Sequence, residues 1–255
     1  MVWVIGHRGA RQLAVENSLA SLQIALDQGA DGVECDVQLS ADGEPLLWHD
    51  ADLQRLCGDA RRLDQLKWRE LRELRPSVAS LQPQPVAHLD DVVEWAQARP
   101  LRLNIELKVA GHAAARRLVE VLLRRIGEYP PELWVFSSFS REALAWLRNL
   151  APAWRRGTLV ENELDLQLVG DPGEIEQLHP CGDLLGVERL QQWQERGWPV
   201  WPWTLNHPAA WERAVQLAGP QAIAALITDD PGGLRRFVDN NGLARAQRST
   251  PAAEP

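Results

Sequence analysis

Residues 32–39 have the sequence GVECDVQL, and residues 101–109 have the sequence LRLNIELKV. Both segments are short, rich in aliphatic and β-branched residues, and therefore predicted to be strands. Side chains two residues apart on a strand point to the same face, so Glu34 and Asp36 share one face, as do Glu106 and Lys108. The remaining aliphatic side chains lie on the opposite faces, which suits packing against helices.

The rest of the chain alternates strand and helix patterns, which is typical of a parallel sheet with crossover helices. Strands are expected over residues 2–6, 32–39, 101–109, 133–137, 155–160, 174–179, 199–205 and 224–228. Helices are expected over residues 16–28, 89–99, 112–129, 141–150, 164–169, 190–196, 208–218 and 232–240. Eight β/α units in this length predict an α/β fold of the TIM (β/α)8 barrel type.

Two segments depart from this alternation. The turn sequence Ala41-Asp42-Gly43 predicts a hairpin whose return strand covers residues 45–48. Residues 50–89 are irregular, and we expect them to form a small insertion over the barrel mouth. Residues 1–242 are then expected to be a single barrel domain, and the polar residues 243–255 are expected to be a disordered tail.

Composition narrows the class of protein. The 255 residues carry a formal net charge of -8, which argues against a nucleic acid partner because polyphosphate binding needs a basic face. The three cysteines, an odd number without metal-ligand spacing, fit a reducing compartment. The apolar N-terminal stretch is too short for a signal peptide, and no apolar run reaches the ~20 residues of a spanning helix. We therefore expect a cytoplasmic protein without stable membrane insertion.

Polar residues gather where the expected strands end. They are His7 and Arg8, Glu34 and Asp36, His49 and Asp50, Glu106 and Lys108, Trp203, Thr204 and Asn206, and Asp229 and Asp230. In enzymes with a (β/α)8 barrel, the active site lies at the carboxyl ends of the strands. A single inward Glu is more often a structural ion-pair partner, and a single His after a strand is more often a hydrogen-bonding residue. The convergence of these residues at one end favours a site.

The residue types indicate a chemistry. Three partly buried carboxylates from Glu34, Asp36 and Glu106 would take up protons or bind a cation, and oxygen ligands favour Mg²⁺, Ca²⁺ or Mn²⁺. Two histidines beside such an ion can exchange protons near neutral pH. Arg8 offers a planar fork for phosphate and Lys108 a point charge. The set is suited to phosphoryl transfer.

These residues resemble the glycerophosphodiester phosphodiesterase family over nearly the whole chain, up to about residue 240. The resemblance is carried by His7-Arg8-Gly9, Glu16-Asn17-Ser18, residues 29–37 (GADGVECDV), Asp42-Gly43 and His49-Asp50, and then by residues 104–108 (NIELK), Ser138-Phe139, residues 203–206 (WTLN) and residues 227–231 (ITDDP). The block between the two histidines is the most specific part. Val15, Ser18 and Ala51 depart from the family pattern, although Ser18 keeps a hydroxyl for capping.

The resemblance implies roles for individual residues. His7 and His49 would be the acid/base pair, and Glu34, Asp36 and Glu106 the ligands of one divalent ion, Mg²⁺ or Ca²⁺, with Mn²⁺ as a further candidate. Arg8 and Lys108 would contact the phosphate, Trp203 would wall the glycerol pocket, and Phe139 would be its neighbour. The implied reaction cleaves a small glycerophosphodiester into glycerol 3-phosphate and an alcohol. The alcohol, the oligomeric state, and the choice between a cyclic phosphate route and direct attack by water stay open.

Three alternatives accompany this interpretation. A related barrel phospholipase acting on lipid head groups would use an exposed apolar rim, for which the twelve tryptophans are candidates. A noncatalytic barrel binding module would typically have lost one of the histidines or carboxylates, all of which are present here. A barrel lyase or isomerase for sugar phosphates would have a glycine-rich phosphate site after the last strands, whereas Gly232-Gly233 follow Asp-Asp-Pro.

Overall fold

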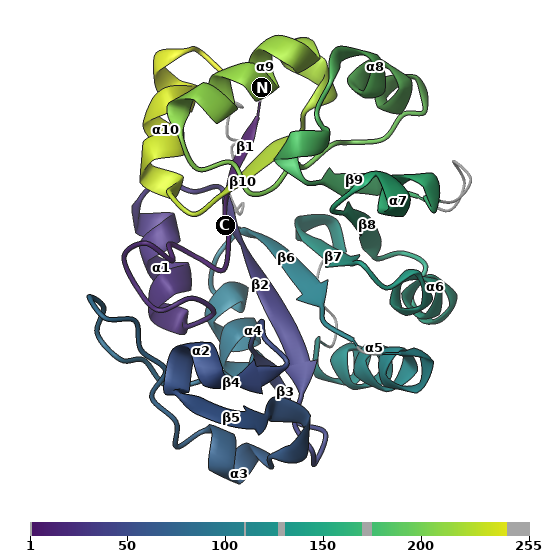
Figure 1. The fold of residues 1–255 in the computed structure, drawn as a ribbon. Coiled ribbons are helices and arrows are strands. Elements are labelled where there is room, and N and C mark those ends of the chain that lie inside the picture. The colour runs from purple at the N-terminus through teal and green to yellow at the C-terminus, as the bar shows by residue number, and fades with distance from the viewer. Residues whose placement is uncertain (1, 110, 127–130, 170–174, 244–255) are drawn as a thin grey trace, which may run out of the picture.

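The computed structural model describes residues 2–109, 111–126, 131–169 and 175–243. In that part of the chain one parallel sheet runs in the order β10-β1-β2-β6-β7-β8-β9 and curls into a barrel-like wall (Figure 1). Its strands are β1 (Trp3–Gly6), β2 (Gly32–Leu39), β6 (Arg102–Leu107), β7 (Trp134–Ser138), β8 (Arg155–Val160), β9 (Gln177–Pro180) and β10 (Ala225–Thr228). The expected α/β barrel class is confirmed.

One expected strand, residues 199–205, is not a continuous strand in the structure. Val200 forms parallel bridges to Leu178 of β9 and Ile223 next to β10, and Trp203 bridges Cys181. Pro199 and Pro202 have no backbone N–H to donate, so the ladder is interrupted at both positions. The segment nevertheless lies between β9 and β10 and completes the ring. The expected strand over 174–179 is also shifted, since β9 begins at Gln177 and residue 174 lies outside the described residues.

Helices follow the strands and cover the outside of the sheet (Figure 1). They are α1 (Leu19–Asp27), α4 (Leu89–Gln97), α5 (His112–Ile126), α6 (Arg141–Leu150), α7 (Glu163–Gln167), α8 (Val187–Glu195), α9 (Pro208–Ala222) and α10 (Pro231–Asn240). Side-chain caps define several starts: Ser18 accepts from the Ser21 amide, Ser140 from Ala143 and Asp230 from Gly233. The short 3-10 helices η2 (Pro131–Leu133) and η3 (Gly182–Leu184) precede β7 and follow β9.

The outward faces of the strands pack as expected. Val33, Cys35 and Val37 of β2 and Ile105 and Leu107 of β6 are fully or almost fully buried in one apolar cluster with side chains of α1, α4, α5 and α6. A second cluster joins β1, β9 and β10 to α8, α9 and α10. Each such side chain contributes roughly 1.5–3 kcal/mol when fully buried, so these faces hold the helices against the sheet and leave the inward faces for polar groups.

The insertion after β2 has a small core of its own. It contains β3 (Pro45–Leu47), paired antiparallel with β2, then β4 (Asp52–Leu53), α2 (Gln54–Cys57), β5 (Asp59–Arg62), η1 (Leu63–Gln65) and α3 (Trp68–Leu71). Its buried apolar residues are Leu46, Trp48, Leu53, Leu56, Leu63, Leu66, Leu71 and Val86. In Figure 1 it lies below the sheet, beside the carboxyl end of β2. The tail is expected to begin at residue 243, but Leu243 is held by two backbone hydrogen bonds, from the Val2 N–H and to the Val238 carbonyl, both at 2.9 Å. Residues 244–255 lie outside the described residues.

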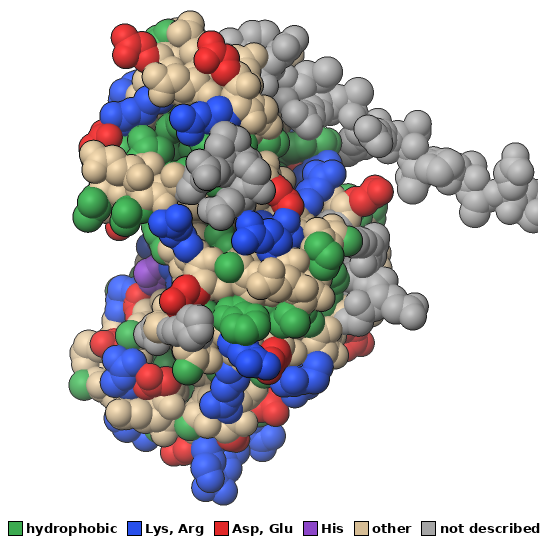
Figure 2. All heavy atoms as spheres, turned by 90° about the vertical axis from the view of Figure 1, so that its right-hand side faces the viewer, with side chains coloured by type: hydrophobic (Ala, Val, Ile, Leu, Met, Phe, Trp, Pro, Cys, Tyr) green, Lys and Arg blue, Asp and Glu red, His purple; other side chains and the backbone are tan. Residues whose placement is uncertain are grey.

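The face of the molecule that includes α5 to α8 does not present one dominant kind of side chain (Figure 2). Figure 2 shows acidic, basic and apolar side chains interspersed on the face that includes α5 to α8. None of the twelve tryptophans is exposed, so tryptophan serves mainly as a packing residue here. No helix in the described ranges is both long enough and apolar enough to cross a lipid bilayer.

His179 on β9 is buried in the wall of the barrel, and no role in a site was assigned to it from the sequence. Its ring stacks on Trp201, with centroids 5.2 Å apart and planes at 4°, and Nε2 lies 3.3 Å from Gln177 Oε1. Gly157 on β8 makes room for the ring, because a Cβ at that position would lie 2.5 Å from His179 Nε2. Burial lowers the pKa of His179 to about 3, so the neutral imidazole is the packed form.

This burial predicts a pH effect on stability. Between pH 6.5 and 3, His179 is protonated in the unfolded chain but stays neutral in the folded protein. The free energy of unfolding therefore falls as pH falls, by up to about 1.4 kcal/mol per pH unit. The variant His179→Gln should show a shallower decline over this window. Urea denaturation of both proteins at pH 6.5, 5.5 and 4.5 measures the difference, and parallel declines would contradict the prediction.

Candidate active site

A cavity of about 400 Å³ opens at the carboxyl ends of the strands, where the sequence places the polar residues. Its wall consists of His7, Arg8, Glu34, His49, Asn104, Glu106, Lys108, Ser137, Phe139, Leu159, Glu161, Trp203 and Ile227. All the expected site residues except Asp36 line it, and Asp36 is fully buried beside Glu34 and Glu106. The structure therefore brings together the nine residues selected from the sequence.

The three carboxylates converge because of strand register. Asp36 on β2 is the register partner of Glu106 on β6, and Glu34 precedes Asp36 by one strand period. One oxygen of each residue lies within 4.8 Å of the others. Glu34 Oε1 accepts no hydrogen bond, and Lys108 Nζ is the cation next to Asp36 Oδ1 at 3.3 Å and Glu106 Oε1 at 2.5 Å. Unsatisfied carboxylate oxygens converging from two strands form a cluster that can hold a divalent ion.

The charges of this cluster are not balanced by protein groups alone. Burial and the neighbouring carboxylates raise the pKa of Glu34 well above its usual value, and burial together with Asp36 raises the pKa of Glu106 to about 7. Burial also acts to raise the pKa of Asp36, but Lys108 and Arg8 outweigh it and keep this pKa below the usual range. A bound cation would supply the positive charge that Glu34 and Glu106 need in order to ionise together.

His7 follows β1 directly and is oriented by a carboxylate. Its Nδ1 lies 2.6 Å from Asp229 Oδ1, and Asn206 fixes that aspartate by donating to Oδ2 at 2.8 Å and accepting from its backbone N–H at 2.8 Å. Burial lowers the pKa of His7 despite the opposing hydrogen bond with Asp229. Because Nδ1 is engaged, Nε2 is the nitrogen left for chemistry in the cavity.

His49 follows β3 in the insertion and has a similar arrangement. Its Nδ1 lies 2.7 Å from Asp50 Oδ1, and its pKa is lowered by burial against the opposing charge of Asp36. Gln38 on β2 holds the backbone here, since its amide nitrogen lies 2.9, 3.1 and 2.8 Å from the carbonyl oxygens of Trp48, His49 and Asp50. Both histidines thus line the cavity with Nδ1 bound to an aspartate, which leaves Nε2 free of that contact.

The loop after β1 is held in an uncommon conformation. Arg8 has φ 54°, and its N–H donates to Glu34 Oε2 at 2.8 Å while its carbonyl accepts from the Asn17 amide and the Ser21 hydroxyl. Gly9 must be glycine, because its φ is 84° and a Cβ would lie 2.2 Å from Ser21 Oγ. The left-handed turn aims the Arg8 guanidinium at Asp36, with Nε 3.1 Å from Oδ2, and at Glu16.

The far side of the cavity is less polar. Phe139 after β7 and Trp203 meet edge to face, with centroids 5.7 Å apart. Trp203 is fixed by donating from Nε1 to the His179 carbonyl at 2.8 Å. Lys108 Nζ lies 5.8 Å from the Phe139 ring, so the aromatic wall begins where the cationic part of the cavity ends.

Several residues that build the site were not selected from the sequence as site residues. Asn17 donates to Asp36 Oδ2 at 2.8 Å and accepts from the Asp36 N–H at 3.0 Å, and Asp229 orients His7. Both lie in motifs that carry the family resemblance, which was the available signal. Gln38 had a weaker signal, namely its position two residues after Asp36 on the same strand face. Glu161 had none.

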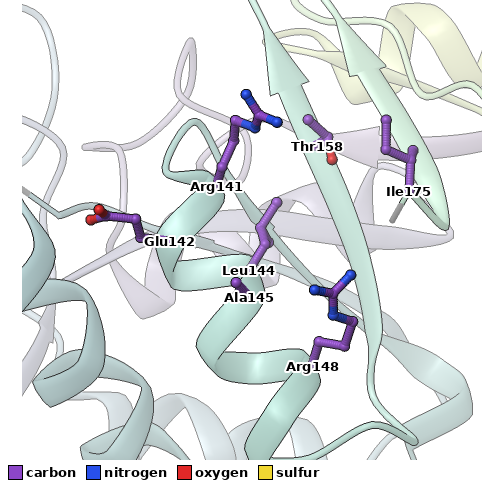
Figure 3. A pocket seen from close by; sticks show the side chains of 7 residues that line it. All are labelled: Arg141, Glu142, Leu144, Ala145, Arg148, Thr158 and Ile175. Carbon is purple, nitrogen blue, oxygen red and sulfur yellow. The ribbon is translucent and has the colours of Figure 1, made fainter. Parts of the chain in front are cut away.

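A second hollow lies on the outside of the sheet, between α6 and β8, and has a volume of about 250 Å³. Figure 3 shows Arg141, Leu144 and Arg148 of α6 directed toward Thr158 of β8, while Glu142 points away. Neither histidine nor any member of the acidic cluster lines it. The reaction chemistry is therefore assigned to the cavity at the strand ends.

Comparisons with known proteins agree with this geometry. The model of the glycerophosphoryl diester phosphodiesterase family matches residues 7–233. A glycerophosphodiester phosphodiesterase of Caldanaerobacter subterraneus subsp. tengcongensis is 28% identical over 244 residues, which cover 94% of this chain and 98% of the relative.

Solved structures give the same result. A phosphodiesterase of Oleispira antarctica, solved in complex with the product sn-glycerol-3-phosphate, superposes with a TM-score of 0.82 at 27% identity and covers 93% of this chain and 96% of its own. A glycerophosphodiester phosphodiesterase of Thermotoga maritima has a TM-score of 0.73 at 27% identity, covering 93% and 98%. The chain belongs to the glycerophosphoryl diester phosphodiesterase family and is a hydrolase.

Proposed function

We propose that this hydrolase cleaves small glycerophosphodiesters to glycerol 3-phosphate and an alcohol, with His7 and His49 as the acid/base pair. The observation that carries the proposal is the pairing of two Nδ1-anchored histidines with one acidic cluster in a single cavity of about 400 Å³. The product found in the Oleispira antarctica relative supports glycerol 3-phosphate as the product here.

The donor set supports one hard divalent ion held by Glu34, Asp36 and Glu106, with Mg²⁺ or Ca²⁺ preferred and Mn²⁺ as a further candidate. Such an ion, when bound, polarises a phosphoryl oxygen and stabilises the negative charge that develops there. The cluster contains only carboxylate oxygens, which disfavours metals that prefer thiolate or imidazole ligands. Binding of a divalent ion also agrees with the charge of the cluster, because its three carboxyl groups cannot all ionise easily without a bound cation.

The chain's own residues would then divide the remaining work. One histidine takes a proton at Nε2 from the attacking hydroxyl, and the other gives a proton to the alkoxide as its bond to phosphorus breaks. The lowered pKa of each histidine, caused mainly by burial, favours the neutral imidazole that a base requires. Asp229 and Asp50 keep the rings oriented and stabilise the imidazolium after proton transfer.

Substrate contacts follow from the two sides of the cavity. Arg8 and Lys108 are the cations that line it, and we assign them to the phosphate. Trp203 and Phe139 form the aromatic wall opposite them, and we assign them to the carbon skeleton of the glycerol. A cavity of this size fits a small diester and has no basic groove for a nucleic acid backbone.

The activity is tested directly by a coupled assay for released glycerol 3-phosphate, using diesters of choline, ethanolamine, glycerol and inositol. We expect turnover of at least one member of this panel, loss of it with chelator, and recovery with Mg²⁺, Ca²⁺ or Mn²⁺. Full activity after exhaustive metal removal would reject the role of the acidic cluster, and product without glycerol 3-phosphate would reject the cleavage position.

Metal binding has a test that does not depend on activity. An ion present at one hundred times its Kd should stabilise the folded protein by about 2.7 kcal/mol. Glu34→Gln removes one of three mutually repelling buried carboxylates, so the metal-free variant should melt at a higher temperature than the metal-free wild type. The rise in melting temperature on adding the ion should be smaller in the variant than in the wild type. Thermal unfolding with and without each ion measures both changes, and an undiminished gain would remove Glu34 from the ligand set.

The histidine roles are tested by His7→Ala and His49→Ala. Each should lower kcat at least a hundredfold, since acid/base groups contribute ~10²–10⁴-fold. His207→Ala is the matched control, because His207 caps α9 away from the cavity and should leave kcat unchanged. Wild-type turnover in either cavity variant, with a melting temperature showing that it is folded, would remove that histidine from the mechanism.

A further inference from the structure

The two histidines of the cavity are connected to each other through a chain of ionic contacts behind them. Each Nδ1 meets an aspartate, and each aspartate meets an arginine. On one side Arg55 Nε lies 2.7 Å from Asp50 Oδ2. On the other side Arg11 Nε lies 3.8 Å from Asp229 Oδ1. The first contact is a hydrogen bond and the second is a looser ion pair.

Both arginines converge on one carboxylate, Glu16, which follows the loop after β1. Arg55 donates to it twice, from Nη1 at 2.9 Å and from Nη2 at 2.7 Å, whereas Arg11 Nη2 lies 3.6 Å away. Arg8 adds a third guanidinium, with Nη1 donating at 2.8 Å. The Glu16 side chain is only 4% exposed and that of Arg55 is 42% exposed, so the pair joins a buried carboxylate to a partly exposed arginine.

Glu16 stays charged throughout the neutral range. Burial acts to raise its pKa, but the hydrogen bonds from Arg55 and the charges of Arg8 and Arg55 lower it to about 2. A permanently ionised Glu16 gives Arg55 a fixed partner on the barrel, while Asp50 is its partner on the insertion. The guanidinium is a planar fork with donors on separate edges, so one side chain can bind both carboxylates at the same time.

The location of Arg55 makes this bridge important. It lies on α2, a single turn, between Leu53 and Leu56, which are buried in the insertion's own core. Glu16 belongs to the segment between β1 and α1, so the bridge ties the insertion after β2 to the connection after the neighbouring strand β1. Without it, Asp50 would keep its contact with His49 but lose the partner that fixes its second oxygen.

We propose that Arg55 is a positioning residue that holds His49 for proton transfer by clamping Asp50 to Glu16. The proposal rests on the proposed function, because it requires His49 to take part in the reaction. Arg11 makes the corresponding connection to His7 through contacts about 1 Å longer, so its replacement should matter less. Arg55 lines no part of the cavity, so any effect on the reaction is indirect, and its hydrogen bond to Asp50 leads to His49.

The first test compares Arg55→Gln with Arg55→Lys under saturating activating ion. Loss of an orienting partner typically costs 10–100-fold, so Arg55→Gln should lower kcat about tenfold or more and leave KM within about twofold. Lysine keeps the charge but is shorter and lacks the planar fork that donates twice to Glu16 and once to Asp50, so Arg55→Lys should restore little of the lost kcat. Arg61→Gln is the matched control, because Arg61 of the same insertion is exposed and pairs with Asp59.

Folding can be separated from positioning in these variants. Glu16 keeps its hydrogen bond from Arg8 when Arg55 is replaced, so each variant should unfold in a single transition near the wild-type melting temperature. Wild-type kcat in Arg55→Gln would overturn the proposal. So would full recovery in Arg55→Lys, since charge alone would then account for the role of Arg55.

The second test is a double-mutant cycle of Arg55→Gln with His49→Ala. If Arg55 acts through His49, then Arg55→Gln should change kcat of the His49→Ala protein by less than about twofold. A further tenfold loss in that background would overturn the proposal while leaving the role of His49 intact. Wild-type turnover in His49→Ala alone would overturn the proposed function and this inference together.

Discussion

The burial of three carboxylates at one end of a closed sheet is the constraint on which the site depends. Parallel register places Asp36 beside Glu106, and the two-residue period of β2 adds Glu34 on the same face. At an effective dielectric constant of about 20, two ionised oxygens 4.8 Å apart repel by roughly 3.5 kcal/mol. Burial and this repulsion together exceed what Arg8 and Lys108 compensate, because Glu34 still has a raised pKa with both cations present. The burial of these carboxylates therefore favours the binding of a cation at this position.

The loop that supplies Arg8 can be understood as part of the same compensation. A non-glycine residue at φ 54° costs about 1–3 kcal/mol, and Asn17 at φ 57° adds a second such position. Both are held by hydrogen bonds to members of the cluster: the Arg8 N–H to Glu34, and the Asn17 amide in a reciprocal pair with Asp36. These hydrogen bonds therefore offset part of the conformational cost of the loop and part of the cost of burying the carboxylates.

Strand period explains why much of this site could be predicted from sequence. Glu34, Asp36 and Glu106 are marked by alternation with buried aliphatic residues, and strand-end position marks His7 and Lys108. The eight β/α units follow from the same patterns. The pairing of residues 199–205 was only partly predictable, because the sequence pattern of a strand does not show how Pro199 and Pro202 divide its ladder into single bridges.

Other features depend on contacts between distant segments, which one sequence does not reveal. Glu16 and Arg55 are 39 residues apart, and Asp229 is 222 residues from His7. Asp229 has a strand-end position and Glu16 lies in a motif of the family resemblance, but neither signal names the residue that it contacts. The pairing of β10 with β1 and the folding of the insertion bring these residues together. The residues that line the cavity are therefore easier to predict than the contacts that orient them.

The charge distribution bears on the kind of phosphate that this cavity accepts. A net charge of -8 repels polyanions at a distance, but the field inside the mouth is set by Arg8, Lys108 and the ion that the cluster calls for. A phosphodiester carries one negative charge and two uncharged ester oxygens, so a single ion and two cations suffice for it. A monoester dianion or a nucleic acid backbone would bring more charge past an acidic surface into a cavity of about 400 Å³. The aromatic wall of Phe139 and Trp203 then offers apolar contact to one ester arm, which a free phosphate lacks. Charge, size and wall together favour a small diester over its competitors.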